Sequence, residues 1–242
     1  MPGHLNQAAK QPHMDLRMSK KTNHSADLLV TEKDGVVARL VVRGAVRRPD
    51  ALQGFLNAFA SVMLSSNACP TASFIAGKVL QRTERTGVFN LEETAQRKQS
   101  FETALRHAQK SGLPIRRLAT ELAHLSRYIA WQSGRSGPFA SVNFSKAHAH
   151  SVLVGPSGIE TRPDIRICLI LMEPYTRFPD NVQARSKAFV LLSPSEICID
   201  GEAWLKVDAG SVFSVEANQT FAIRCTSQPS LAIWCQLEEG FK

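Results

Sequence analysis

A succession of short β-rich segments in the second half of the chain most restricts the folds open to it. Each segment is four to eight residues long and is rich in valine, isoleucine, leucine and phenylalanine. Short strands that recur about every 8–12 residues are typical of an all-β barrel or sandwich. We expect eight strands, at residues 151–154, 165–172, 188–192, 196–199, 203–207, 211–215, 220–225 and 231–236.

Turn-forming residues stand between these segments. The runs 155–158, 200–201 and 208–210 read Gly-Pro-Ser-Gly, Asp-Gly and Asp-Ala-Gly. Glycine accepts positive φ angles and aspartate bonds to its own backbone, so both favour tight turns. Eight short strands joined in this way predict a double-sheet barrel of the jelly-roll kind, which we assign to residues 131–242.

The region before residue 130 has helical periodicity instead. Leu52, Phe55, Leu56 and Phe59 recur at intervals of three and four after Pro49, the spacing of one helix face. Residues 27–130 are therefore predicted to be mainly helical, which makes the chain α+β. The expected helices are 50–66, 72–80, 91–110 and 114–129.

The N-terminal residues differ from both regions. Residues 1–26 are polar and basic without periodicity and predict a disordered tail. Residues 28–46 contain two β-branched runs around Asp34-Gly35, a dipeptide typical of hairpin turns. We expect a hairpin there, which needs a surface to pack on.

Composition limits the setting in which the protein works. No apolar run reaches the roughly 18–20 residues that span a bilayer. The N-terminus has no apolar core of a secretory signal, so we expect a cytoplasmic protein with no membrane contact. The five cysteines show no Cys-x-x-Cys spacing and predict reduced thiols rather than a disulfide framework or a zinc site.

The net charge of +8 is unevenly distributed. Residues 161–242 carry 8 basic and 10 acidic side chains, whereas residues 1–160 carry 21 basic and 11 acidic ones. A basic half could attract nucleic acid. The charges are scattered along helices without interleaved aromatic residues, so a solvated surface is the preferred interpretation and nucleic-acid binding is not expected.

Several runs in the second half match a known family in order and spacing. They are the run from Ala147 to Gly158, the run from Asp164 to Asp180, and later positions that include Trp204 and Trp234. In these residues the chain resembles the dimethylsulfoniopropionate (DMSP) lyase family of cupins, over about residues 115–240 and more faintly over 50–115. The resemblance implies a cupin barrel, or double-stranded β-helix, and by analogy a homodimer.

The resemblance also implies a reaction and a cofactor. Members of the family split dimethylsulfoniopropionate into dimethyl sulfide and acrylate, the dimethylpropiothetin dethiomethylase reaction. A divalent transition metal in the barrel mouth would bind the substrate carboxylate and acidify the neighbouring proton. A tyrosinate-type base would remove that proton, which requires a lowered pKa.

The residues of this chain that match the family's metal and base positions differ in kind. Two amides, an ammonium group and three phenyl rings replace histidine, glutamate and tyrosine. The ligand positions hold Asn181, Gln183, Lys187 and Phe221, and the tyrosine positions hold Phe178 and Phe189. Transition metals prefer histidine nitrogen and carboxylate, and a lysine cation repels a divalent ion. We therefore expect no metal cofactor and take these six residues as the candidate binding site.

The polar residues of this set allow two interpretations. On a regular strand Asn181, Gln183, Arg185 and Lys187 would share one face and make a cationic mouth for a small carboxylate ligand. On a loop, the same cations would be solvated. The three phenylalanines either line an apolar pocket or fill the space of the lost metal site.

His148 and His150 form a His-x-His pair outside the family's ligand set. On an extended segment both side chains point to one side, a spacing that can bind metal. With no third ligand evident in the sequence, a structural role is the preferred interpretation.

Three functions remain open from the sequence. The first is a catalytically degenerate relative that binds a small carboxylate or a partner without metal. The second is an active carbon–sulfur lyase with relocated ligands such as His148 and His150. The third is a regulatory cupin whose basic helical half is the effector part.

Overall fold

The computed structural model describes residues 47–238 of the chain. These residues all belong to one compact unit. The disordered tail expected at residues 1–26 and the hairpin expected at 28–46 lie outside the described residues.

Helices form where apolar residues recur at helical spacing. The first covers Asp50–Met63 and buries the face that carries Leu52, Phe55 and Phe59. The second begins at Pro70, whose fixed φ and missing N–H suit the first turn. The helices are α1 (Asp50–Met63), α2 (Pro70–Arg82), α3 (Gln99–Ala108), α4 (Leu113–His124) and α5 (Phe144–Ala147), with the 3₁₀ helix η1 at Ser126–Tyr128.

Three expected helices are longer than the observed ones, and the one expected at 50–66 ends at Met63. Residues 91–98 are extended rather than helical, and their backbone is tied to distant groups. Thr94 N–H donates to the carbonyl oxygen of Arg127, and Gln96 Oε1 accepts from Trp131 N–H. This segment has a helix-favouring composition but no apolar face, so it gains nothing from a helical turn. The helix expected at 114–129 ends at His124 and continues as η1.

The strands form two sheets, which confirms the expected β-rich second half. The larger sheet has the order β1-β3-β2-β4-β11-β6-β9 and the smaller one β5-β10-β7-β8. The larger sheet comprises β1 (Val88–Phe89), β2 (His148–Val154), β3 (Glu160–Thr161), β4 (Ile165–Met172), β6 (Lys187–Leu191), β9 (Val212–Val215) and β11 (Ser230–Leu237). The smaller sheet comprises β5 (Asn181–Val182), β7 (Ser195–Ile199), β8 (Leu205–Val207) and β10 (Thr220–Arg224).

All eight expected strands are present, and three further ones were not expected. The additional strands β1, β3 and β5 are two residues long, too short to show alternation. Strand β2 begins at His148, three residues earlier than expected. The architecture of N-terminal helices followed by a β-rich barrel is mixed α+β, as predicted.

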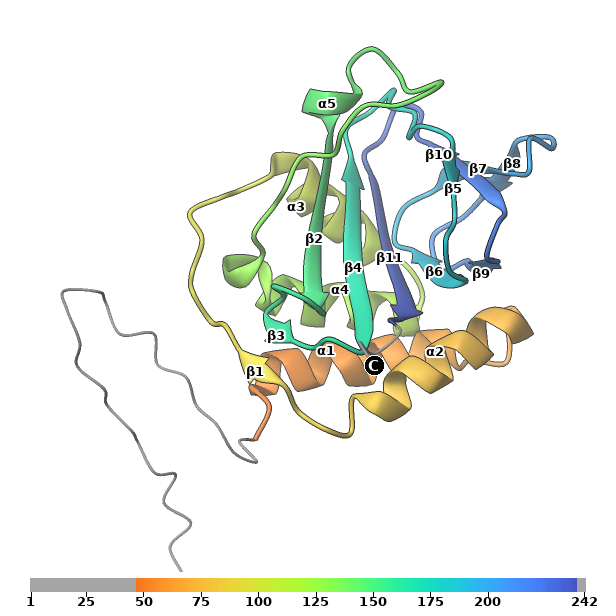
Figure 1. The fold of residues 1–242 in the computed structure, drawn as a ribbon. Helices are drawn as coiled ribbons and strands as arrows, with labels where there is room; N and C mark the ends of the chain where they lie inside the picture. Colours follow the sequence, from red (N-terminus) through yellow and green to blue (C-terminus); the bar gives the residue numbers. More distant parts are fainter. Residues whose placement is uncertain (1–46, 239–242) are drawn as a thin grey trace, which may run out of the picture. The chain divides into compact units, whose positions relative to one another are not determined.

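Two apolar layers hold the sheets in place. Alternation along β6 directs Ala188 and Val190 into the core shared with the helices, and Phe189 and Leu191 into the core between the sheets. In Figure 1, α1 and α2 (orange) cross below β4 and β11, and the smaller sheet stands beside β11. The division of the chain into residues 27–130 and 131–242 stays a prediction. Strand β1 belongs to the first of these regions but pairs with β3, which belongs to the second.

Candidate functional site

The candidate site lies on the face of the larger sheet that is turned toward the smaller sheet, which we call the inner face. Side chains opposite one another in antiparallel register share a face. His148 pairs with Met172, His150 with Ile170, and Trp234 with both Cys168 and Phe189. Because Phe189, Ile170 and Met172 belong to the core between the sheets, all of these side chains point to the barrel interior.

The structure brings two of the candidate phenylalanines together. Phe189 on β6 and Phe221 on β10 are each 2% exposed, and their ring centroids are 5.0 Å apart. The Phe213 ring stacks on Phe189 at 5.1 Å. Fully buried, mutually packed rings make up core rather than the wall of an open pocket. For these two residues, the interpretation that phenylalanines fill the space of the lost metal site therefore fits better than an open apolar pocket.

Phe178 belongs to a different group of rings. It is half-buried and meets Phe144 at 5.3 Å and His148 at 5.2 Å, both edge to face. Its backbone N–H donates to the carbonyl oxygen of Ile223 in β10. Phe178 thus closes the end of the barrel near α5.

The segment that holds the two amides is not one regular strand. β5 ends at Val182 and β6 begins at Lys187. Asn181 is exposed and pairs with Phe221 across β5 and β10, whereas Gln183 is 3% exposed. The Gln183 amide donates to the Asn181 carbonyl oxygen at 3.2 Å. The two amides therefore do not share an open face. Residues 183–186 lie between the two strands, whereas Lys187 begins β6 and is half-buried rather than solvated, so neither interpretation holds for the whole segment.

Lys187 is the candidate residue that offers a polar atom on the inner face. Its side chain is half-buried, and Nζ lies 4.5 Å above the ring of half-buried Trp234. Burial lowers the pKa of Lys187; among its neighbours Cys168 and Glu238 raise this pKa and Arg166 lowers it. Within residues 47–238 the ammonium group forms no hydrogen bond or ion pair, and its closest aromatic contact is the indole face of Trp234.

A carboxylate bracketed by two guanidinium groups lies beside Lys187. Glu238 Oε2 accepts a hydrogen bond from Arg185 Nη1 at 2.5 Å. Glu238 Oε1 lies 2.9 Å from Arg166 Nε but outside hydrogen-bond geometry, so this contact is an undirected ion pair. Gln236 Nε2 donates to the same oxygen at 2.7 Å. The cations Arg166, Arg185 and Lys187 and the carboxylate of Glu238 therefore lie close together at this end of the barrel.

The His-x-His pair is packed as aromatic rings. His148 is 4% exposed and stacks on Phe144 at 4.6 Å and on His150 at 5.6 Å. Neither ring nitrogen of His148 has a hydrogen-bond partner in the described part of the chain. Burial lowers the pKa of His148 to about 4, with a smaller effect of His150. Gly134 faces Nδ1 so closely that a Cβ there would lie 2.5 Å from it.

The residues at the family's ligand positions do not fit a divalent transition metal. They supply a buried amide, an exposed amide, an ammonium group and a buried phenyl ring. Within residues 47–238 no three or more His, Cys, Asp and Glu side chains are grouped closely enough to hold a metal ion. His148 and His150 are two ligands at most, and the His148 ring is enclosed. No reaction step through a metal is derived for this site.

Neither tyrosine of the chain stands in for the missing phenols. Tyr175 follows β4 and is 73% exposed, with a φ of 59°. Tyr128 lies in η1 and lines a separate cavity at the edge of the larger sheet.

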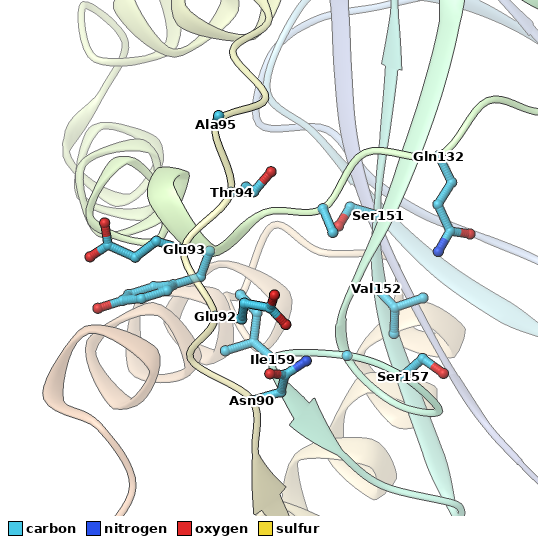
Figure 2. Close-up of a pocket in the computed structure, with 13 residues that line it drawn as sticks. Asn90, Glu92, Glu93, Thr94, Ala95, Gln132, Ser151, Val152, Ser157 and Ile159 are labelled. Atoms are coloured by element: carbon cyan, nitrogen blue, oxygen red, sulfur yellow. The ribbon is translucent and has the colours of Figure 1, made fainter. Parts of the chain in front are cut away.

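That separate cavity is a feature that the sequence did not indicate. It has a volume of about 400 Å³ and lies between the extended segment 90–95 and the edge of β2. Figure 2 shows Glu92 and Asn90 on one side of it and Ser151, Val152 and Ser157 on the other. It exists because residues 91–98 are extended along the sheet rather than helical, so no periodicity could reveal it.

None of the described helices is long and apolar enough to pass through a membrane.

Comparison with known proteins identifies the family of this chain. The family model of dimethylsulfoniopropionate lyase covers residues 78–232, more than half of the chain. A structure from a study of the DMSP lyases RdDddP and RnDddQII aligns over 79% of this chain and 94% of its own, with a TM-score of 0.60 and 16% identity. The DMSP lyase DddQ from Ruegeria pomeroyi aligns over 78% and 92%, with a TM-score of 0.58 and 13% identity.

Other cupins match a smaller share of the chain. A cupin-2 domain from Rhodospirillum rubrum aligns over 48% of this chain and 72% of its own, with a TM-score of 0.37 and 10% identity. No curated protein sequence matches the chain. The expected resemblance and fold are both confirmed: this chain belongs to the dimethylsulfoniopropionate lyase family and has its helix-plus-cupin fold.

Proposed function

We propose that this chain is a catalytically degenerate DMSP lyase-like cupin that binds a small carboxylate on the inner face of its barrel without a metal. The observation that carries the proposal is the replacement of a metal-binding carboxylate position by Lys187. Its ammonium group lies on the inner face and forms no hydrogen bond or ion pair within residues 47–238. A fixed positive charge thus stands where a relative would hold its cation.

The surrounding charges favour an anion. Arg166 and Arg185 both pair with Glu238, and Lys187 lies close to that carboxylate, so several positive charges lie near the proposed ligand. Hydrogen bonds from an ammonium or guanidinium group to a carboxylate are shorter and stronger than neutral ones. The half-buried Trp234 ring offers an apolar surface to the carbon chain of such a ligand. A short-chain carboxylate fits both features.

The same residues argue against the elimination reaction. Abstraction of a proton next to a carboxylate needs a base whose pKa lies near the working pH. Phe178 and Phe189 have no phenolic oxygen, and Lys187 carries a positive charge that opposes its action as a base until it loses its proton. His148 and His150 are poor substitutes as metal ligands because the His148 ring is enclosed by Phe144 and Gly134.

Calorimetric titration with propionate and acrylate tests the binding. We expect both to bind the purified protein and Lys187→Met to abolish the heat signal. Lys206→Met is the control, since Lys206 is exposed on β8 in the smaller sheet. Equal binding by wild type and Lys187→Met would refute the site.

A headspace assay tests the lack of elimination. The protein is incubated with dimethylsulfoniopropionate after the separate addition of iron, manganese, zinc and nickel salts. We expect no dimethyl sulfide above a protein-free blank. Release of dimethyl sulfide in proportion to protein concentration would instead establish the alternative, an active carbon–sulfur lyase with relocated ligands.

A further inference from the structure

The amine of Lys187 combines three features that are seldom found together. It faces the barrel interior, it lies on the apolar face of Trp234, and it forms no hydrogen bond or ion pair within residues 47–238. An amine that is engaged with a carboxylate is held in its charged form, and a charged amine has no lone pair to donate. Because Lys187 forms no such ion pair in the described part of the chain, its nitrogen can act as a nucleophile once it is deprotonated.

We propose that Lys187 condenses reversibly with the carbonyl group of a small oxo-carboxylate, such as a 2-oxo acid, to form an imine. The amine nitrogen adds to the carbonyl carbon, and the carbonyl oxygen takes up a proton to give a carbinolamine. Loss of one water molecule then gives the C=N bond. No electrons are gained or lost overall, so the step needs no oxidant or reductant.

The neighbours of Lys187 suit both parts of such a ligand. The Arg166 guanidinium is engaged by Glu238 at Nε, which leaves its terminal nitrogens for the ligand carboxylate. Burial lowers the pKa of Lys187, which increases the neutral fraction of the amine at a given pH. Cys168, opposite Trp234 in the sheet, does not compete as a nucleophile, because burial raises its pKa and keeps it a neutral thiol.

This inference rests on the proposed carboxylate site and adds a covalent step to it. Reductive trapping tests that step: the full chain is incubated with pyruvate, treated with sodium borohydride, and digested for peptide mass analysis. We expect a carboxyethyl group on Lys187 at a level about ten-fold or more above that on the exposed Lys206. Lys187→Arg removes the adduct while it keeps the positive charge, whereas Lys206→Arg leaves the Lys187 adduct unchanged.

The outcomes separate the covalent step from the binding site. Propionate should suppress the trapping because it occupies the same site without a carbonyl group. Binding of propionate by calorimetry together with no preferential label on Lys187 would overturn the imine and leave the carboxylate site standing. Loss of both signals in wild type would overturn both proposals. Circular dichroism of Lys187→Arg confirms that any loss of label comes from the amine rather than from unfolding.

Discussion

Arg48 and Glu160 form a buried ion pair across 112 residues of the chain, with Arg48 Nε 2.7 Å from Glu160 Oε2. Their side chains are 6% and 0% exposed. Arg48 also donates to the carbonyl oxygen of Thr83, and Glu160 accepts from Gly87 N–H at 2.8 Å. The pair therefore ties the start of α1, the end of α2 and the β1–β3 edge of the sheet to one another.

Removal of one partner from this pair should be strongly destabilising. Glu160→Ala leaves the Arg48 charge buried without its carboxylate, and we expect a loss of about 3–5 kcal/mol in the free energy of unfolding. Urea unfolding followed by circular dichroism measures it. Glu93→Ala is the control, because its pair with Arg127 is exposed on both sides and should change stability by less than about 1 kcal/mol. Equal effects of the two substitutions would contradict this account.

The buried His148 ring predicts a loss of stability in acid. Its pKa is about 4 in the folded protein, below the ordinary value of 6.5, because burial penalises the charged form. Above pH 6.5 the folded and unfolded states are both neutral at this ring. As the pH falls from 6.5 toward 4 only the unfolded state gains the proton, which costs up to about 3 kcal/mol of stability.

The substitution His148→Phe isolates this contribution. It keeps an aromatic ring between Phe144 and His150 and removes the titration. We expect the melting temperature of the variant to fall less than that of wild type between pH 7 and pH 4. Burial lowers the pKa of His150 as well, so a smaller dependence of the same sign should persist. If the melting temperatures of wild type and His148→Phe fall equally between pH 7 and pH 4, His148 does not contribute to the loss of stability in acid.

The close approach of Gly134 to His148 gives a steric prediction. A Cβ at position 134 would lie 2.5 Å from Nδ1 and 2.8 Å from Cε1, so the ring must move. We expect Gly134→Ala to destabilise the fold by about 1–3 kcal/mol. Gly112→Ala, where nothing lies within 4 Å of the new Cβ, serves as control and should be nearly neutral. In the double variant Gly134→Ala/His148→Ala the penalty of the first change should largely vanish.

The strength of local patterns decided how much of the fold could be predicted. The helix at residues 50–66 and the strand at 165–172 repeat apolar side chains often enough to be recognised, and both are present. Residues 91–98 were predicted as helix because their composition favours one, yet hydrogen bonds to Arg127 and Trp131 hold them extended. Such bonds come from distant parts of the chain and leave no local signal.

The sequence predicts which kinds of side chain the candidate site contains, but not which of them contact one another. The expectation that Asn181, Gln183, Arg185 and Lys187 share one face was wrong, because β5 ends at Val182 and β6 begins at Lys187. The contact of Lys187 with Trp234 depends on the pairing of β6 with β11, which the sequence does not specify. The approach of Phe178 to His148 depends on how residues 133–147 close the barrel end, which likewise has no signature in the sequence.

The carboxylate of Glu238 marks the position at which a ligand carboxylate should be able to bind. Glu238→Ala removes the anion that Arg166 and Arg185 share, and we expect a loss of about 1 kcal/mol in the free energy of unfolding. Acetate or propionate should restore the lost stability of Glu238→Ala, because a free carboxylate can occupy the space that the side chain leaves. Thermal unfolding at fixed ionic strength, with chloride in place of the carboxylate as reference, measures the effect.

Glu196→Ala is the matched control for this rescue. The Glu196 side chain is 15% exposed, as is that of Glu238, but it pairs with a single arginine, Arg224 at 2.5 Å. Acetate should stabilise Glu238→Ala and leave Glu196→Ala unchanged, because two guanidinium groups and the nearby Lys187 attract the anion at the first site only. Equal stabilisation of both variants would mean that acetate acts as a general salt, and this end of the barrel would then have no selectivity for carboxylates.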